Sequence, residues 1–525
     1  MTTNQQGSEQ SQSVRDIPLF AASLDLPIDI EARVLEILKH EHEIILHVTN
    51  ETKRLEHISE LAELAYKISK AIFSPSVVLE KSLIEKTLSE SWSQTCYETP
   101  NFILRPESSI QVSLALKLVN FLQVPFSIRS GGHSPNPGWN SVRHGLLIDF
   151  AKLNAMKISD DRRTVSVGPG ATWGDVYQYL DPYDVTAIGG RVPQVGVGGL
   201  MLGGGISFFT GEYGLAADNV EDIEIVLADG SIAHANSQDN SDLFWALKGG
   251  GPNFGIVTQY RLRTVPIKNI WYQMQVHSPN DAPALFSAFA SWQNSPDVKG
   301  SVVMIATLSS IILGLVYSAP MENPPCFEPF YGIEPMLTVI PSTIGTVLAL
   351  SQISGANPSA LPRHDYRGAS STIDPDLYLA VFETWKKEAA AAHETSGCNM
   401  TFVLQHIPKN VVDVGAARSG NPLGLEPISQ QWWTTLLDWQ DSAHDDVVRG
   451  AAIATSKKWE ELGKARGSHL PFLYMNDASR DQNPLASYGS ENLERLRRVA
   501  RKYDPQSIFQ CLQNNGFLLA KVDGW

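Results

Sequence analysis

The chain has 525 residues, of which 43% are hydrophobic and 18% are charged, and its formal net charge is −15. This length can form two or three hydrophobic cores, because a single core stops growing at about 250–300 residues. The strong negative charge argues against nucleic acid and anionic membranes as partners. No apolar run approaches the roughly 20 residues that are needed to span a bilayer.

The first 13 residues are polar and carry neither the basic start nor the apolar centre of a secretory signal. We therefore expect cytoplasmic localisation, and we expect residues 1–15 to be disordered because they have little to bury. The four cysteines are too widely spaced for a metal-ligand pattern, and nothing requires a disulfide: Cys96, Cys326, Cys398 and Cys511. We predict no metal site.

From about residue 30 to residue 88, apolar residues recur at spacings of three and four, which predicts helices. These helices are expected to pack on the main body as an N-terminal extension, within a first segment of residues 1–95. From 96 to 267, short apolar runs alternate with glycine-rich turns. We predict strands at 102–105, 124–129, 145–149, 164–167 and 223–227, with a helix at 109–122.

A second pattern covers residues 268–465. Apolar strands at 301–307, 311–316 and 400–405 are expected to alternate with helices at 283–292, 375–392 and 431–441. Trp432 and Trp433 would begin the last of these helices, and most of the apolar run 340–350 is assigned to the core. The last segment, 466–525, contains a predicted helix at 490–502. The fold class is therefore α+β, with an antiparallel sheet in the second region.

Two glycine-rich loops carry the first functional signal. Residues 129–138 (Arg-Ser-Gly-Gly-His-Ser-Pro-Asn-Pro-Gly) directly follow a predicted strand. Paired glycines allow backbone N–H groups to approach a ligand and to form an anion-binding nest. Taken alone, however, a Gly-Gly turn is more often an ordinary tight turn.

The second loop, residues 189–205, has eight glycines among 17 residues, a density that costs backbone entropy and suggests a large ligand lying against the backbone. Its Gly-Val-Gly-Gly spacing lacks the strand–helix–strand context of a dinucleotide fingerprint, so we reject a Rossmann fold. A third element, residues 242–258, reads as a short helix, a Gly-Gly-Gly turn and a strand.

Together these elements resemble the vanillyl-alcohol-oxidase or PCMH type of FAD-binding domain. More narrowly, they are similar to the berberine-bridge-enzyme-like FAD-linked oxidases, especially the fungal ones of secondary metabolism. The motifs that carry the resemblance are the segments 129–134, 167–176, 190–199, 202–209, 213–220, 226–230, 243–250 and 253–258, with Tyr-Met-Asn at 474–476 near the C-terminus. The resemblance is strong over about 95–267 and over the last 60 residues, and it does not reach residues 1–90.

The resemblance implies a two-part FAD-binding domain at 96–267, a substrate-binding domain at 268–465, and a C-terminal segment that returns to the FAD domain. It implies that the first loop wraps the FAD diphosphate and that His133 carries the flavin through an 8α-histidyl link. The cofactor-binding residues that it suggests are Arg129, Ser130, Gly131, Gly132, His133, Ser134, Gly190, Val192, Pro193, Gly196, Gly198, Gly199, Gly203, Gly204, Ser207, Gly255, Ile256, Val257 and Asn476.

Many relatives add a second flavin link through a cysteine that follows the Gly-Gly-Arg motif. Here Val192 stands at that place, and Leu200 stands where the doubly linked relatives often have histidine. Because valine cannot bond to flavin, we predict a single covalent link on His133.

The resemblance also implies hydride transfer from a substrate carbon to flavin N5, reoxidation by O₂, and a side-chain base near the flavin. The segment 418–426 resembles a turn that precedes the base in relatives, and it makes Glu426 one candidate. An exposed loop-end glutamate is an equal interpretation. His406 is a second candidate, although a core histidine is more common. Tyr474 is the third.

The leading hypothesis is an FAD-dependent oxidase of a small molecule, with a secondary metabolite as the expected substrate. One alternative is an isomerase or cyclase on the same scaffold, in which acid–base chemistry causes no net oxidation. A carbohydrate oxidase and a redox-silent binding protein are further alternatives.

Overall fold

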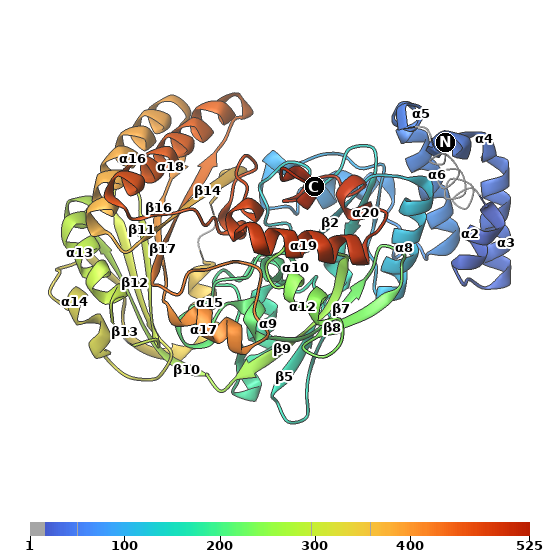
Figure 1. The fold of residues 1–525 in the computed structure, drawn as a ribbon. Coiled ribbons are helices and arrows are strands. Elements are labelled where there is room, and N and C mark those ends of the chain that lie inside the picture. The colour runs from blue at the N-terminus through green and yellow to red at the C-terminus, as the bar shows by residue number, and fades with distance from the viewer. Residues whose placement is uncertain (1–15, 50, 296, 357–358) are drawn as a thin grey trace.

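The computed structural model describes residues 16–49, 51–295, 297–356 and 359–525. The disorder expected for residues 1–15 falls outside this range. Three sheets organise the chain, and they lie side by side with the N-terminal helices at one end of the molecule (Figure 1). The predicted fold class is confirmed: a two-part domain with the glycine-rich loops, a domain with a large antiparallel sheet, and a helical N-terminal extension.

The N-terminal extension is helical and shares a core with the first sheet. Val34, Leu38 and Leu61 are fully buried in one cluster with Leu116 and Phe126, so the extension is packed on the main body as predicted. Its helices are α2 (Ile17–Ser23), α3 (Ile28–His40), α4 (His42–Ile45), α5 (Glu51–Glu56), α6 (Ile58–Ile72) and α7 (Ile84–Leu88).

The region with the glycine-rich loops has two sheets. The first is a parallel sheet in the order β1-β3-β2, and the second is antiparallel in the order β4-β5-β9-β7-β8, with β6 paired to β9. The strands are β1 (Phe102–Leu104), β2 (Phe126–Arg129), β3 (Leu146–Asp149), β4 (Met156–Ile158), β5 (Thr164–Val167), β6 (Thr186–Ala187), β7 (Val220–Val226), β8 (Ile232–Asn236) and β9 (Ile256–Val265). The helices are α8 (Ser109–Leu122), α9 (Trp173–Leu180), α10 (Val197–Leu202), α11 (Thr210–Tyr213) and α12 (Ser241–Leu247).

The third sheet has nine strands in the order β13-β10-β12-β11-β16-β17-β14-β18, with β15 paired to β17. Its strands are β10 (Asn269–His277), β11 (Gly300–Ala306), β12 (Ile311–Tyr317), β13 (Leu337–Thr346), β14 (Arg363–Thr372), β15 (Asn399–Met400), β16 (Phe402–Ile407), β17 (Gln430–Trp439) and β18 (His469–Leu470). The other helices are α13 (Ala282–Gln293), α14 (Glu328–Tyr331), α15 (Val347–Ser354), α16 (Pro375–Ser396), α17 (Asn410–Ala417), α18 (Asp445–Arg466), α19 (Ser490–Tyr503) and α20 (Ile508–Cys511).

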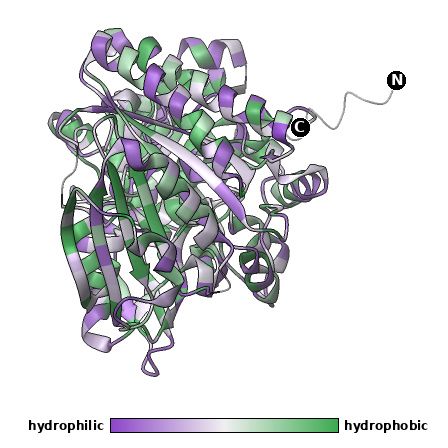
Figure 2. Cartoon of the chain, turned by 90° about the vertical axis from the view of Figure 1, so that its left-hand side faces the viewer, coloured by the Kyte–Doolittle hydropathy of each residue, from purple (hydrophilic) through white to green (hydrophobic). Residues whose placement is uncertain are grey.

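Local signals explain the long helix α16. The Asp374 side chain accepts a hydrogen bond from the Leu377 N–H, and proline stands at the first helical position. The helix ends where Gly397 adopts a left-handed conformation. Figure 2 views the molecule from the side of the large sheet, whose strands are mostly hydrophobic, whereas the helices at the top carry both colours.

Two predictions in the large sheet are wrong. The predicted helix at 431–441 is strand β17, which lies between β14 and β16, so Trp432 and Trp433 are strand residues. Its aromatic and threonine residues favour a strand, but both of its faces are buried, so the alternation that marks a half-buried strand is missing. The run 340–350 is not mainly core, because much of it is the edge strand β13, where Ile344 is 46% exposed.

The two faces of the large sheet contact different parts of the protein. Because successive strand residues point to opposite faces, Gln405 and His406 lie on different sides. The side that carries Gln405 contacts the second glycine-rich loop through Arg191, and we call it the loop face. The other side packs on α13 and α16, and we call it the helix face. No helix in the described part of the chain is long and apolar enough to cross a membrane.

Candidate functional site

The two glycine-rich loops touch through their backbones. A Cβ atom on Gly131 would lie 2.5 Å from the Gly196 N, and one on Gly196 would lie 2.3 Å from the Gly131 N. The Ser130 hydroxyl donates a hydrogen bond of 2.6 Å to the Pro169 carbonyl, and the Gly198 N–H donates one of 3.2 Å to Ser130. Glycine at 131 and 196 is therefore required for the loops to meet.

The first loop presents a row of free backbone donors. Among the described residues, no group accepts a hydrogen bond from the backbone N–H groups of residues 130–134. Gly132 adopts a positive φ of 66°, which turns the chain within this row. Successive free N–H groups in such a turn form an anion nest, and a diphosphate supplies the acceptors that they lack. The loop thus fits the diphosphate of FAD.

Arg129, one of the suggested cofactor residues, lies at the end of β2. Its guanidinium is buried and pairs with Asp149 at 2.9 Å and with Glu90 at 3.2 Å, and it also donates to the Thr87 carbonyl. Since its donors are used by protein groups, Arg129 anchors the end of β2 to the N-terminal extension. It fixes where the loop begins rather than presenting a charge to a ligand.

The His133 imidazole lies against the Trp92 indole, with ring centroids 4.3 Å apart and 10° between the planes. The backbone N–H of Trp92 donates to the Gly132 carbonyl at 2.9 Å, and the Trp92 indole is also parallel to the His364 ring at 4.2 Å. Burial, together with the neighbouring His364 imidazole, lowers the pKa of His133 to about 4. At neutral pH the His133 ring is therefore uncharged and has a free nitrogen lone pair.

The segment that contains Trp92 also joins the first loop to the large sheet. The His364 N–H on β14 donates to the Ser93 hydroxyl at 2.8 Å, and the Gln94 N–H donates to the Pro362 carbonyl at 2.8 Å. His364 in turn lies 2.6 Å from Asp438. The surroundings of His133 are therefore built by three parts of the chain.

The second loop combines anchored and open positions. The Gly190 carbonyl accepts a hydrogen bond of 2.7 Å from Tyr177, and Pro193 packs on Gly174. Val192 is 38% exposed, and no atom lies within 4 Å of the Cβ position on Gly199. Open space therefore lies beside Gly199, on a helix that begins next to the first loop.

The C-terminal motif returns to this loop. Asn476 donates to the Leu200 carbonyl and to the Tyr474 hydroxyl, each at 3.0 Å. The Tyr474 hydroxyl also accepts from the Ile206 N–H at 3.1 Å. A Cβ on Gly203 would lie 2.0 Å from the Asn476 side chain, so that glycine makes room for the amide. Tyr474 and Asn476 thus lie together at the second loop, near Gly204.

The remaining suggested cofactor residues are buried in the scaffold. Gly255 has a φ of 157°, and a Cβ there would lie 2.7 Å from the Val226 carbonyl. Ile256 and Val257 begin β9 and pack in two different cores. The Ser207 hydroxyl accepts from the Phe209 N–H at 3.3 Å. In the described part of the chain, no hydrogen bond joins any of these four residues to the Arg191 side chain or to the stacked rings of His133, Trp92 and His364.

A polar cluster that the sequence reasoning did not assign lies between the second loop and the large sheet. Arg191 donates to the Gln405 side chain, which donates to Asp477 at 2.7 Å. Burial raises the pKa of Asp477, and Gln405 and Arg191 oppose that shift. Asp477 directly follows the recognised Tyr-Met-Asn motif, which was the signal that could have found it.

Tyr474 borders the same cluster. Burial and the nearby Asp477 carboxylate raise its pKa above the ordinary range, and its ring stacks on Trp432 of the loop face at 5.0 Å. The cluster therefore holds one carboxyl group whose proton affinity is increased, beside an arginine and a neutral phenol. Such an arrangement can accept or donate a proton.

Two suggested bases lie outside this cluster. The Glu426 side chain is exposed in the loop between α17 and β17, where its carbonyl accepts from Gln430 at 3.0 Å. The partly desolvated setting expected for Glu426 is absent there, because its side chain is exposed to solvent. His406 lies on the helix face, 3.4 Å from Gln293 and edge-on to Trp292. The sheet therefore separates His406 from the glycine-rich loops.

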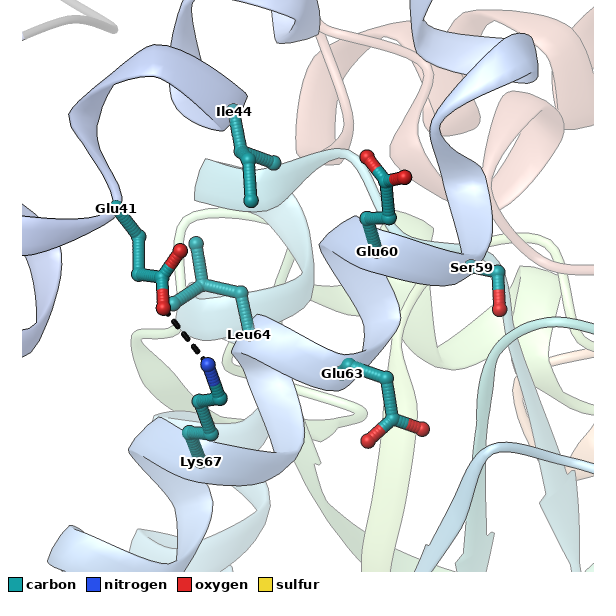
Figure 3. Close-up of a pocket in the computed structure, with 7 residues that line it drawn as sticks. All are labelled: Glu41, Ile44, Ser59, Glu60, Glu63, Leu64 and Lys67. Carbon is teal, nitrogen blue, oxygen red and sulfur yellow. Dashed lines mark hydrogen bonds and ion pairs between the residues drawn. The ribbon is translucent and has the colours of Figure 1, made fainter.

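Other features of the chain do not join this site. A hollow of about 200 Å³ lies on the N-terminal extension and is lined by Glu41, Ile44, Ser59, Glu60, Glu63, Leu64 and Lys67 (Figure 3). Lys67 pairs there with Glu41 at 2.7 Å. The four cysteines are free thiols. In the described ranges, no group of three or more histidine, cysteine or acidic side chains is arranged to hold a metal ion.

Comparison with known proteins supports the cofactor. The family model described as an FAD binding domain matches residues 100–236. An FAD-dependent monooxygenase of Arthrobotrys oligospora is 37% identical over 432 residues, which cover 82% of this chain and 84% of that protein. The bifunctional solanapyrone synthase of Alternaria solani is 34% identical over 431 residues, covering 81% and 83%.

Solved structures support the fold. The glucooligosaccharide oxidase of Acremonium strictum, described with a 6-S-cysteinyl, 8α-N1-histidyl FAD, is 19% identical, with a TM-score of 0.70. The match covers 82% of this chain and 95% of that one. At this identity the likeness concerns the arrangement of the chain, and it includes both the glycine-rich domain and the large sheet.

Proposed function

Because the chain belongs to the berberine-bridge-enzyme-like family of FAD-dependent oxidoreductases, we propose that it is an oxidase of a small molecule and that His133 carries its flavin. The observation that carries the proposal is the first loop itself. Its free backbone donors offer an anion site, and a neutral imidazole follows directly in the same turn. The bound FAD would take a hydride from a substrate carbon and pass the electrons to O₂.

Different residues would bind the diphosphate of the cofactor, leave room for its ring and accept the substrate proton. Residues 130–134 would hold the diphosphate through their N–H groups. Gly199 leaves open space that a flat ring can occupy, and Asn476 presents an amide beside it. Asp477 would accept the substrate proton, because its raised pKa brings its proton affinity nearer to neutral pH. Arg191 holds Asp477 in place through Gln405.

We propose a single covalent link, through His133. The Acremonium strictum enzyme has a histidyl link and a cysteinyl link, whereas Val192 occupies the position that we compare with its second anchor. Cys96, the cysteine next to Asn140, has a pKa raised by burial to about 11, so its thiol stays protonated. Neither feature offers a thiolate for a second bond to the flavin.

A substrate-free experiment tests the oxidase assignment. The purified flavoprotein is reduced with dithionite under anaerobic conditions, and air-saturated buffer is then added while the ~450 nm band is followed. We expect the band to return within seconds, with one H₂O₂ formed for each flavin. A reduced flavin that persists in air for many minutes would eliminate O₂ as the acceptor.

The isomerase alternative needs a separate measurement, because it requires no reduced flavin during turnover. Anaerobic mixing with a substrate distinguishes the two. Oxidation bleaches the flavin in the same step that forms the product, whereas isomerisation forms the product with the band unchanged. The raised pKa of Asp477 is compatible with proton shuttling, which keeps this candidate open.

A further inference from the structure

The loop face of the large sheet continues from Gln405 toward the free edge of the sheet. Residues that are paired directly across antiparallel strands share one face. The pairing therefore extends the row that contains Val403 across four more strands. The members of this row are Ile305 on β11, Ile312 on β12, Val276 on β10 and Leu337 on β13.

A second row runs parallel to the first, one step closer to the glycine-rich loops. Val303 on β11 pairs with Gly314 on β12, Gly314 pairs with Met274 on β10, and Met274 pairs with Ile340 on β13. From β11 to β13 the loop-face positions in these two rows are all apolar or glycine, whereas Gln405 on β16 and Thr434 on β17 are polar. None of the positions from β11 to β13 carries a charge or a hydroxyl group.

The side chains of these rows are more exposed to solvent than the core residues on the helix face of the same strands. On β11, the helix-face residues Met304 and Ala306 are buried, whereas Val303 and Ile305 on the loop face are half-buried. One row further toward the glycine-rich domain, Val316 and its partner Tyr272 are buried in the core that the two domains share. Val303 and Ile340 of the second row are partly buried against this same core, whereas the first-row residues beyond β16 do not belong to it. The loop face therefore leaves the domain core between the two rows and continues as a half-buried to exposed apolar surface.

Leu337 at the end of the first row is 59% exposed. Leaving so many apolar side chains in water costs free energy that a folded protein otherwise recovers by burial. Contiguous apolar surface of this kind marks a binding site when polar groups border it. Here the bordering polar groups are Gln405 and its partners, Arg191 and Asp477.

We propose that this apolar face binds the hydrocarbon part of the substrate, an aliphatic chain or ring system that extends from the Asp477 cluster toward β13. The proposal rests on the proposed function, since it places the oxidised carbon beside the cluster. An oligosaccharide would instead need side chains that bind hydroxyl groups along its length. The two apolar rows offer none, which separates this protein from an oligosaccharide oxidase.

Binding of simple probes to the FAD-containing protein tests this assignment. Linear primary alcohols from butanol to octanol and the disaccharide cellobiose are titrated by calorimetry. A buried methylene contributes about 0.8 kcal/mol, close to a fourfold change in Kd. We expect Kd to fall two- to fourfold for each added methylene, and we expect cellobiose to bind more weakly than octanol. An absence of any dependence on chain length, or tighter binding of cellobiose, would overturn the proposal.

Variants locate the binding surface. Ile305→Asn should weaken octanol binding at least fivefold, and Ile312→Thr is a milder second variant if the first misfolds. The matched control is Ile232→Asn, at a 40% exposed position on β8 of the other domain, and it should leave Kd unchanged. Equal loss in Ile232→Asn, or no loss in either sheet variant, would contradict the assignment. Because calorimetry requires no turnover, failure of the oxidase assignment would appear separately, in the air-reoxidation experiment.

Discussion

Trp92 lies flat against His133, and its backbone N–H donates a hydrogen bond to the Gly132 carbonyl, which fixes the chain that carries the indole. The indole therefore limits the orientation of the imidazole that we propose as the flavin anchor. We expect Trp92→Ala to lower the covalently bound fraction of flavin several-fold, because the His133 ring then samples more rotamers. The covalent fraction is measured from the yellow colour that remains with the acid-precipitated protein.

Trp92→Phe keeps a flat ring and should retain most of the covalent flavin. Trp292→Phe, on α13 in the core against the helix face, is the control for loss of an indole elsewhere. Full covalent incorporation in Trp92→Ala would show that the stack does not orient His133.

The contact between Gly131 and Gly196 predicts a strong effect of a single methyl group. Gly131→Ala would place a Cβ 2.5 Å from backbone, so it should lower the melting temperature and the FAD content together. Gly450→Ala is the control, because its Cβ meets nothing within 4 Å in α18. It should be neutral or stabilising by up to about 1 kcal/mol. Normal FAD content and an unchanged melting temperature in Gly131→Ala would refute the close packing of the loops.

A substitution at Gly199 distinguishes an effect on folding from an effect on cofactor binding. Its Cβ would meet open space in the chain alone, so Gly199→Ala, like Gly450→Ala, should leave the melting temperature of the FAD-free protein unchanged or slightly raised. If the flavin lies beside it, the same variant should weaken FAD binding, which is measured by fluorescence quenching during reconstitution. Unchanged FAD affinity would place the flavin elsewhere.

The proposed role of Asp477 as the base predicts that kcat/KM depends on pH. A carboxylate that accepts a proton is active only when ionised, so kcat/KM should rise with pH through its raised pKa. Asp477→Asn should remove this acid limb and lower kcat about 10²- to 10⁴-fold. Both are measured with a substrate that bleaches the wild-type flavin. Glu426→Gln is the comparison, because Glu426 is the other carboxylate candidate. Loss of the limb in Glu426→Gln instead would move the base to that loop.

His406 makes stability depend on pH. Burial lowers its pKa from 6.5 to about 3, so the unfolded chain binds a proton that the folded chain refuses. Stability should therefore fall as pH drops from 6.5 toward 3, by on the order of 2–3 kcal/mol at pH 4.5. His406→Gln should flatten this dependence in urea unfolding, and His40→Gln, at an exposed position, should not. Parallel pH curves for His406→Gln and the wild type would contradict this assignment.

The sequence predicted the fold well where local pattern and geometry agree. The strand–turn order around residues 126–134 and the amphipathic helix α19 were predicted because their periodicity is visible in the chain itself. The family and the FAD-dependent activity followed from ordered motifs and are confirmed. Strand β17 was missed because burial on both faces removes its alternation, and the 22-residue helix α18 was not foreseen.

The candidate site was less predictable, because it depends on contacts across long sequence separations. Gln405 and Asp477 are 72 residues apart, and Arg191 lies a further 214 residues from Gln405. Neighbours in sequence can also face opposite ways, which is why Gln405 joins the cluster and His406 does not. The cofactor contacts, the cytoplasmic localisation and the domain boundaries stay predictions.

Peptide mapping of the flavin tests the central claim most directly. Trypsin releases residues 130–143 as one peptide, which contains His133 as its only histidine and has no cysteine. We predict that this peptide carries the mass of one FAD and that His133→Ala abolishes the yellow colour of the acid-precipitated protein. Flavin found on a cysteine-containing peptide, or a wild-type protein that releases all its flavin in acid, would contradict the account.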